Sequence, residues 1–334
     1  MNRPFPNGPE FVYSVSRQRS FDWCKRRYWF NYYGYWNGWS RSVLEESDAQ
    51  RLYVAKKRKR IPMWIGEVSH IWIGRLLEGK INADLVIGKA QDAVRAQWRE
   101  AVANARRIER GQWVHPKDPV FLEHIRGDVD EEELEQGLHQ IEDCINAVIA
   151  DDYQLHFAEA RAAGRYTFVE TELGPSDFET QSIMIQQGAE RIKVFTKLDC
   201  VVERPRNRYR IIDWKTGVPP SDEAASIQIR LYASWLQQQL EKAGRDWGEA
   251  EVEAYSVFLP SGDRHGGRLS KADINSSLDE ALAASRGLSK LHTQLVDQDG
   301  YLRQNQRHLC EPTPAEFRCS RCEFQDCCED AWME

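Results

Sequence analysis

Near the middle of the chain an acid and a lysine stand two positions apart, directly after two apolar residues, in the segment Ile211-Ile212-Asp213-Trp214-Lys215-Thr216-Gly217. This pattern is typical of a strand end, where residues i and i+2 lie on the same face. Asp213 and Lys215 are therefore expected to point into one site. A carboxylate beside an ammonium group can hold a divalent cation and steer a water molecule, as hydrolysis of a phosphodiester requires.

A second acid and a glutamine–tyrosine pair accompany this motif. Asp199 is expected on the preceding strand, and a hairpin around Pro205 would bring its carboxylate close to Asp213. Oxygen ligands of this kind suit Mg²⁺ or Mn²⁺. Gln228 and Tyr232 are four positions apart on an expected helix and so share a face. A lone Asp-x-Lys is usually a solvated strand end, but the ordered set is much less expected by chance.

Three cysteines with the spacing Cys-x-x-Cys-x5-Cys lie near the C-terminus, and a further cysteine lies about 300 residues upstream. They are Cys319, Cys322 and Cys328, with Cys24 near the N-terminus. A Cys-x-x-Cys with a third cysteine nearby indicates a metal or cluster site, and its spacing suits zinc and iron–sulfur groups equally well. Two further cysteines, Cys310 and Cys327, leave the choice of ligands open.

The elements that must position these groups follow from the changing period of the sequence. Residues 62–162 are mostly helical in pattern, with a loop over Gly111–Gly127 and a new helix beginning in the acidic run from Asp128 to Glu135. From Arg165 the period becomes that of strands. Four strands are expected in succession, as an antiparallel meander: Arg165–Leu173, Gln181–Gln187, Glu190–Glu203 and Arg208–Trp214.

A helix and one more strand are expected after this meander. Ser221 is a suitable N-cap for the helix, and Gly244 suits its end. Val252–Leu259 has the pattern of a fifth strand, and helix followed by a cysteine-rich tail is expected beyond it.

Composition limits the possible partners. The chain has 334 residues, 41% of them hydrophobic, which is enough for one elaborated domain or two closely packed ones. A net charge of −7 excludes a strongly basic field over the whole protein, so a nucleic-acid surface must be a local patch. One run of five cations could contact phosphates, or could be an ordinary solvated surface: Lys56, Lys57, Arg58, Lys59 and Arg60.

Compartment is also suggested by composition. The N-terminus lacks the apolar core of a signal peptide, and no apolar run approaches the length of a membrane span. A cytoplasmic protein without membrane contact is therefore expected. Eight cysteines in such a compartment indicate thiolates or metal ligands before disulfides.

Taken in order, these motifs make the chain resemble the PD-(D/E)XK nuclease superfamily. The narrower resemblance is to its iron–sulfur branch, which includes RecB-like CRISPR-associated exonucleases and the AddB nuclease domain. The residues that carry it run from Cys24 through His70 in Gly66-Glu67-Val68-Ser69-His70, Asp199, Asp213-Trp214-Lys215 and Gln228-x-x-x-Tyr232 to Cys319, Cys322 and Cys328. The resemblance implies an α/β fold: a restriction-endonuclease-like core with a central mixed sheet flanked by helices, plus a helical region and a cysteine-rich C-terminal tail.

The resemblance also implies a role for each group. His70, Asp199 and Asp213 would bind the catalytic Mg²⁺ or Mn²⁺, with the Trp214 carbonyl as a further ligand. Lys215 would position or activate the attacking water. The remaining roles are orientation of the scissile strand by Gln228 and Tyr232, and ligation of a 4Fe–4S cluster, with zinc as the alternative, by Cys24, Cys319, Cys322 and Cys328.

One position departs from the family pattern. Lys197 stands where members often carry glycine, so it could crowd the strand or reach a phosphate. Glu170 or Glu172 could supply an extra acid.

The expected organisation has four parts. These are an N-terminal segment at 1–60 with the first cluster cysteine and the basic run, a helical region at 61–164 with His70, a nuclease core at 165–300, and a cluster-binding tail at 301–334 that packs back on the N-terminus.

The function implied is a metal-dependent DNA nuclease, expected to be an exonuclease on single-stranded DNA or DNA ends. DNA repair or recombination and phage or CRISPR-related defence all use such enzymes. The alternative is a non-catalytic nucleic-acid-binding or scaffold subunit of a larger helicase–nuclease assembly. The sequence has no P-loop, so any helicase motor would come from a partner.

Overall fold

The computed structural model of the protein describes residues 8–39, 48–127, 130–170, 181–219, 226–303 and 306–331. The chain divides into two compact units, each assembled from segments that are distant in sequence. The first unit comprises Met1–Arg60, Glu100–Val129 and Leu282–Glu334; the second comprises Ile61–Arg99 and Asp130–Ala281. None of the described helices combines the length and apolar character that a bilayer crossing requires.

A five-stranded sheet in the order β1-β4-β5-β6-β7 forms the centre of the second unit. Its strands are β1 (Thr167–Val169), β4 (Cys200–Arg204), β5 (Arg208–Lys215), β6 (Glu251–Phe258) and β7 (Asp263–Leu269). β5 and β6 pair in parallel, whereas the other neighbours are antiparallel. The predicted mixed sheet flanked by helices is therefore confirmed.

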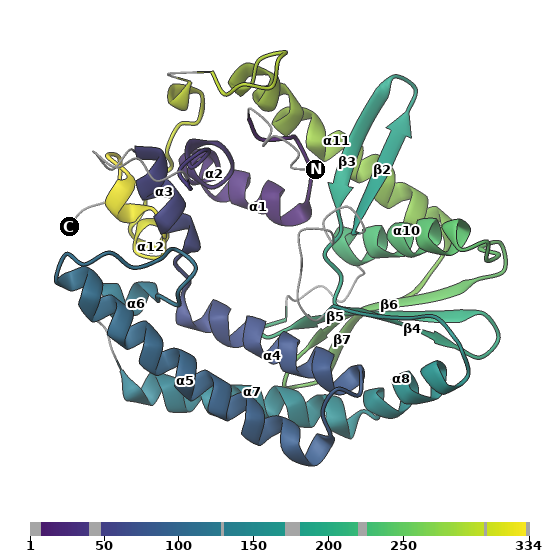
Figure 1. The fold of residues 1–334 in the computed structure, drawn as a ribbon. Coiled ribbons are helices and arrows are strands. Elements are labelled where there is room, and N and C mark those ends of the chain that lie inside the picture. The colour runs from purple at the N-terminus through teal and green to yellow at the C-terminus, as the bar shows by residue number, and fades with distance from the viewer. Residues whose placement is uncertain are drawn as a thin grey trace, which may run out of the picture. The chain divides into compact units, whose positions relative to one another are not determined.

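Helices cover both faces of this sheet (Figure 1). On one face lies α10 (Ile227–Lys242); on the other lie α4 (Ile61–Leu77), α7 (Glu131–Ala150) and α8 (Tyr153–Ala162). β5 is central and apolar on both faces, because Ile211, Ile212 and Trp214 are all buried.

α10 makes the crossover that a parallel pair requires. The helix begins at Ile227, after Ser226, whose side chain accepts a hydrogen bond from the backbone of Ile229. The N-cap predicted at Ser221 lies outside the described residues. Gly244, with a φ of 68°, follows the helix end as predicted.

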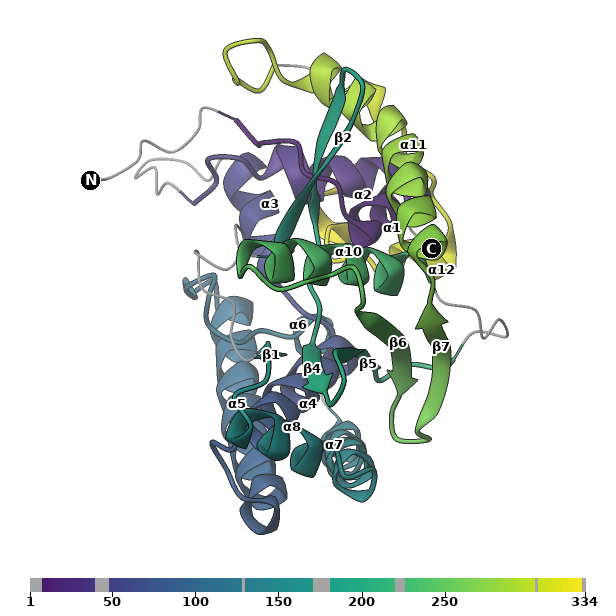
Figure 2. The same cartoon turned by 90° about the vertical axis from the view of Figure 1, so that its right-hand side faces the viewer.

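The predicted four-strand meander is wrong, because its middle part forms a separate hairpin. β2 (Ser182–Gln187) pairs only with β3 (Glu190–Phe195) among the described strands. The backbone of Thr196 bonds the Gln181 carbonyl at 2.8 Å and closes this hairpin, after which residues 196–199 leave the strand conformation. Figure 2 shows the hairpin rising away from the sheet beside α10.

β7 was not predicted from the sequence, where only helix was expected after the fifth strand. Its middle holds Gly266 and Gly267, which have poor strand propensity. Gly266 has a φ of 129°, and a Cβ there would collide with the Ala254 carbonyl of β6. The backbones of β6 and β7 approach closely here, so this position of β7 requires glycine. For this reason the sequence lacks the alternation that would predict a strand.

The first unit is mostly helical. Its elements are α1 (Val15–Trp23), α2 (Lys25–Trp29), the π-helix Phe30–Gly34, α3 (Asp48–Lys57), α6 (Leu122–Ile125), the 3-10 helices Arg307–Leu309 and Gln325–Cys327, and α12 (Glu316–Cys319). Two long helices, α5 (Ala83–Glu109) and α11 (Lys271–Leu295), supply residues to both units.

Many of the N-terminal aromatic residues form the core of this unit. Tyr28, Phe30 and Tyr33 are buried. The Arg17 guanidinium donates to the hydroxyls of Tyr28 and Tyr33, each at 3.1 Å, and satisfies its buried charge in this way.

Candidate active site

Two carboxylates meet where β4 begins and β5 approaches its end. Cys200 of β4 pairs with Ile212 of β5, so Asp199 and Asp213 occupy neighbouring positions across the same ladder. Both side chains are buried. Asp199 Oδ2 accepts a hydrogen bond from the Trp214 backbone at 2.6 Å, which fixes one acid onto the strand that carries the other.

His70 reaches this pair from α4. Its Nδ1 lies 3.2 Å from Asp199 Oδ1. Burial works against a charged imidazole, yet Asp199 and Asp213 keep the pKa of His70 above its ordinary value. α4 comes close to the strand end at Gly66, where an added Cβ would lie 2.8 Å from the Thr216 hydroxyl.

Lys215 and Asp213 form an ion pair, as their spacing on one strand predicts. Lys215 Nζ lies 2.5 Å from Asp213 Oδ2, and Ser256 of β6 donates to the same oxygen at 3.4 Å. Burial raises the pKa of Asp213 to about 6; Lys215 opposes this effect and Asp199 adds to it. Asp199 behaves oppositely: burial raises its pKa, but His70 and Lys215 outweigh this and leave it below the ordinary value.

Gln228 and Tyr232 lie side by side on α10, as expected. Gln228 Nε2 donates to the Tyr232 hydroxyl at 2.5 Å, and that hydroxyl in turn donates to the Lys197 carbonyl. The same hydroxyl is 3.5 Å from Asp213 Oδ1. These contacts tie the pair to the segment just before Asp199 and to the acid on β5.

A cleft of roughly 700 Å³ lies beside the two buried acids, and their partners His70 and Lys215 line it. His70, Trp214 and Lys215 line it, together with Glu170 and Lys197. Lys197 Nζ lies 3.2 Å from Glu170 Oε1, so the lysine that departs from the family pattern is paired with one of the two candidate extra acids. The other, Glu172, lies outside the described residues.

Two cleft features escaped the sequence analysis. Glu67 lines the cleft one helical turn before His70, and this i, i+3 spacing could have revealed it. Ser256 reaches Asp213 only because β6 pairs with β5, and no sequence signal marks that contact.

The donor set suits a hard divalent cation. Two carboxylates, a carbonyl position and one imidazole match the ligands of Mg²⁺ or Mn²⁺. Within the described ranges, however, no three His, Cys, Asp or Glu side chains are arranged so that they could hold a metal ion as they stand. Instead Asp199 is engaged by His70 and Asp213 by Lys215. The residues therefore fit such an ion chemically, and binding it would require these two pairs to loosen.

The basic run of the first unit is largely engaged within that unit. Lys56 Nζ donates to the Asn31 carbonyl at 2.7 Å and lies 3.6 Å from the centroid of the Tyr35 ring. Arg58 pairs with Asp326 and Arg60 with Glu123, both at 3.3 Å. Lys57 is exposed, and the Lys59 backbone forms a bridge with Phe121.

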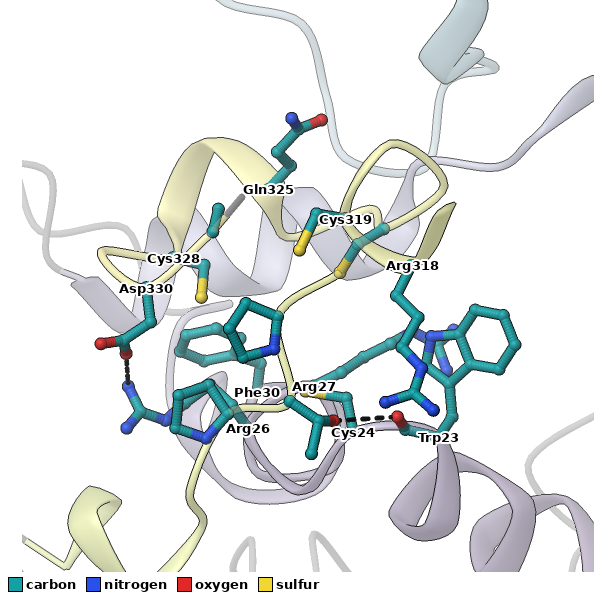
Figure 3. Close-up of a pocket in the computed structure, with 15 residues that line it drawn as sticks. Trp23, Cys24, Arg26, Arg27, Phe30, Arg318, Cys319, Gln325, Cys328 and Asp330 are labelled. Atoms are coloured by element: carbon teal, nitrogen blue, oxygen red, sulfur yellow. Dashed lines mark hydrogen bonds and ion pairs between the residues drawn. The ribbon is translucent and has the colours of Figure 1, made fainter. Parts of the chain in front are cut away.

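The first unit also gathers the cysteines that the spacing singled out. Cys24, Cys319, Cys322 and Cys328 line one small cavity of about 30 Å³, and the three labelled in Figure 3 have their sulfur atoms at its wall. Cys310 is buried and Cys327 lies nearby, but neither lines this cavity. None of the eight cysteines, all of which lie in the described ranges, forms a disulfide.

Ion pairs hold the tail against α2 around this cavity. Both oxygens of Glu323 accept from Arg27, each at 2.9 Å, and Arg26 pairs with Asp330 at 2.8 Å. The Phe30 and Phe324 rings lie 5.4 Å apart beneath them. These contacts join residues that are about 300 positions apart in the sequence.

The chain is similar to known proteins at the level of a family. No curated protein matches the sequence. Among solved structures, one titled "Crystal structure of SSO0001" matches at 12% identity over 71% of this chain and 85% of that chain. The TM-score of this match is 0.25, which is too low to support a conclusion about the fold. Among protein families, the PD-(D/E)XK nuclease superfamily matches residues 12–329. The narrower iron–sulfur branch stays a prediction, but this match spans nearly the whole sequence, and the chain belongs to the PD-(D/E)XK nuclease superfamily.

Proposed function

We propose that this protein is a Mg²⁺- or Mn²⁺-dependent deoxyribonuclease that acts on single-stranded DNA or DNA ends. The observation that carries the proposal is the contact of His70 with Asp199 and of Lys215 with Asp213 at one strand end, where His70 and Lys215 line a cleft. Members of the superfamily are usually nucleases that cleave phosphodiesters, and this constellation has the residue types that such cleavage needs.

Each residue has a distinct part in this proposal. Asp199, Asp213, His70 and the Trp214 carbonyl would hold the cation, which supplies Lewis acidity toward the phosphodiester when bound. Lys215, freed from Asp213, would orient the attacking water and offset negative charge that develops on the phosphate.

Gln228 and Tyr232 support the site from behind. Through its hydroxyl Tyr232 holds the Lys197 carbonyl, and this fixes the backbone two residues before Asp199. Gln228 and Tyr232 are therefore positioning residues for the two acids, in addition to any contact that they make with the scissile strand.

The cysteine cavity would hold a 4Fe–4S cluster. The four thiols line one cavity of the first unit, and thiolates serve an iron–sulfur cluster or a zinc ion equally well by spacing. The cluster is preferred on the resemblance to the iron–sulfur branch, with zinc as the alternative. We propose Cys24, Cys319, Cys322 and Cys328 as its ligands, with a structural role that clasps the two distant segments of the first unit.

The biological setting proposed is DNA repair, recombination or defence against phage, with a helicase or another protein subunit as the partner. Cleavage of single-stranded DNA labelled at either end would give the polarity. Circular single-stranded DNA would separate endonuclease from exonuclease action, and RNA of matched sequence would separate DNA from RNA specificity.

Replacement of the central acid tests the proposal. Asp213→Asn should abolish cleavage in Mg²⁺ and in Mn²⁺ while binding of single-stranded DNA persists, because the group acts mainly in the transition state. Asp92→Asn, an exposed change on α5, is the matched control and should cleave normally. If the wild type binds DNA but cleaves none of the substrates, the non-catalytic alternative is favoured. If Asp213→Asn cleaves normally, the site is wrong.

A further inference from the structure

We propose that Lys197 contacts a backbone phosphate of the bound strand beside the reaction centre, and that Glu170 holds Lys197 in place until the phosphate replaces it. The inference rests on the proposed nuclease function. It assigns a substrate contact to the position where this chain departs from the family pattern.

The two side chains differ in a way that suits these roles. Lys197 is 52% exposed in the cleft, whereas its partner Glu170 is 13% exposed. The acid is therefore fixed at the wall and the lysine reaches toward the opening. A partly exposed ion pair of this kind is weak, so a phosphate can displace the carboxylate at little cost.

Both backbones are anchored to the catalytic segment. The Glu170 amide donates to the Asp199 carbonyl at 2.7 Å, and the Lys197 carbonyl accepts from Tyr232. These bonds keep the lysine at a set place relative to the acids. A phosphate that Lys197 binds would thus lie in a defined register with the scissile bond.

The charges of the cleft show why such a contact is useful. Glu67, Glu170, Asp199 and Asp213 place four carboxylates in or beside the path of a polyanion. Lys215 is already committed to Asp213 at 2.5 Å. Lys197 is the more exposed of the two lysines that line the cleft, and so it is better placed to meet an incoming phosphate.

Salt-dependent binding measures this contact directly. A labelled single-stranded oligonucleotide is titrated with proteins carrying Asp213→Asn, which prevents cleavage, at salt concentrations from about 50 to 200 mM. Adding Lys197→Gln should reduce the slope of log K against log salt by about 0.7, the value for one phosphate contact on a single strand, and weaken binding about fivefold at low salt.

Three further variants separate the contact from general effects. Lys197→Arg keeps the charge and should restore the slope. Glu170→Gln should leave the slope unchanged and bind at least as tightly as the parent. Lys242→Gln removes an exposed lysine at the end of α10 and should change neither slope nor affinity. In otherwise wild-type protein, Lys197→Gln should raise KM more than it lowers kcat.

The results that would refute the Lys197 contact differ from those that would refute the nuclease function. If the wild type cleaves and Lys197→Gln binds with the slope and affinity of Lys242→Gln, the phosphate contact is refuted and the function stands. If Glu170→Gln in otherwise wild-type protein binds DNA but loses cleavage, Glu170 acts at the reaction centre and the inference is equally refuted. Wild-type protein that neither binds nor cleaves DNA would overturn both.

Discussion

Replacing Tyr232 by Phe removes one hydroxyl from behind the acids and leaves the buried ring in place. That hydroxyl accepts from Gln228 at 2.5 Å and donates to the Lys197 carbonyl. The variant therefore leaves a main-chain acceptor and an amide donor without their partner.

The cost in stability follows from these two bonds. Leaving a buried polar group unsatisfied costs about 1–3 kcal/mol. A loss of about 2 kcal/mol lowers Tm by about 4–8 °C in a unit of this size. The effect on catalysis should be larger, because displacement of a reacting group by about 1 Å can reduce the rate about 100-fold. We expect kcat to fall about 10- to 100-fold with little change in KM.

Tyr209→Phe is the matched control for this experiment. Tyr209, near the start of β5, is also buried, and its hydroxyl forms a hydrogen bond with the side chain of Arg245. It stands four residues before Asp213 on the strand, about 13 Å away. The control should therefore lose stability and keep its turnover. The reasoning is refuted if Tyr232→Phe shows a lowered Tm by calorimetry but cleaves within twofold of wild type, or if both variants lose turnover equally.

Two further predictions concern the first unit. If the proposed cluster is present, Cys24→Ala should lose the iron and the broad absorbance near ~400 nm of the anaerobically purified protein, while Cys327→Ala keeps both. Iron retained in Cys24→Ala would remove that residue from the ligand set. Burial lowers the pKa of Lys56 to about 7, from 10.5 in the unfolded chain, so the unfolded state binds more protons between these values. The free energy of unfolding of the wild type, measured by urea titration, should therefore rise from pH 7 to about pH 10 relative to that of Lys56→Met. If the unfolding free energies of the two proteins change with pH in the same way, the amine of Lys56 is not buried as described.

The sequence was a good guide wherever a local spacing determines a local geometry. Two positions on one strand share a face, and Asp213 and Lys215 do meet. The turn around Pro205 does join β4 to β5, which sets Asp199 beside Asp213. Four positions on a helix share a face, and Gln228 does reach Tyr232.

Pairings between distant strands were beyond such reasoning. Alternation shows that a segment is a strand but not which strand it joins, so the hairpin of β2 and β3 was merged into the sheet. Glu170 meets Lys197 because the chain, after that hairpin, returns to pair β4 with β1. Ser256 reaches Asp213 because the α10 crossover sets β6 parallel to β5. These contacts depend on tertiary packing, which leaves no periodic signal.

The contacts between α2 and the tail have a consequence for synthesis. Arg27 and Glu323 are 296 residues apart, so the partner of Arg27 leaves the ribosome about 15–60 s later at typical elongation rates. Until then Phe30 has no Phe324 to pack against, and the aromatic surface around it stays open to solvent. Slowed elongation should lengthen this exposure and reduce the yield of folded protein.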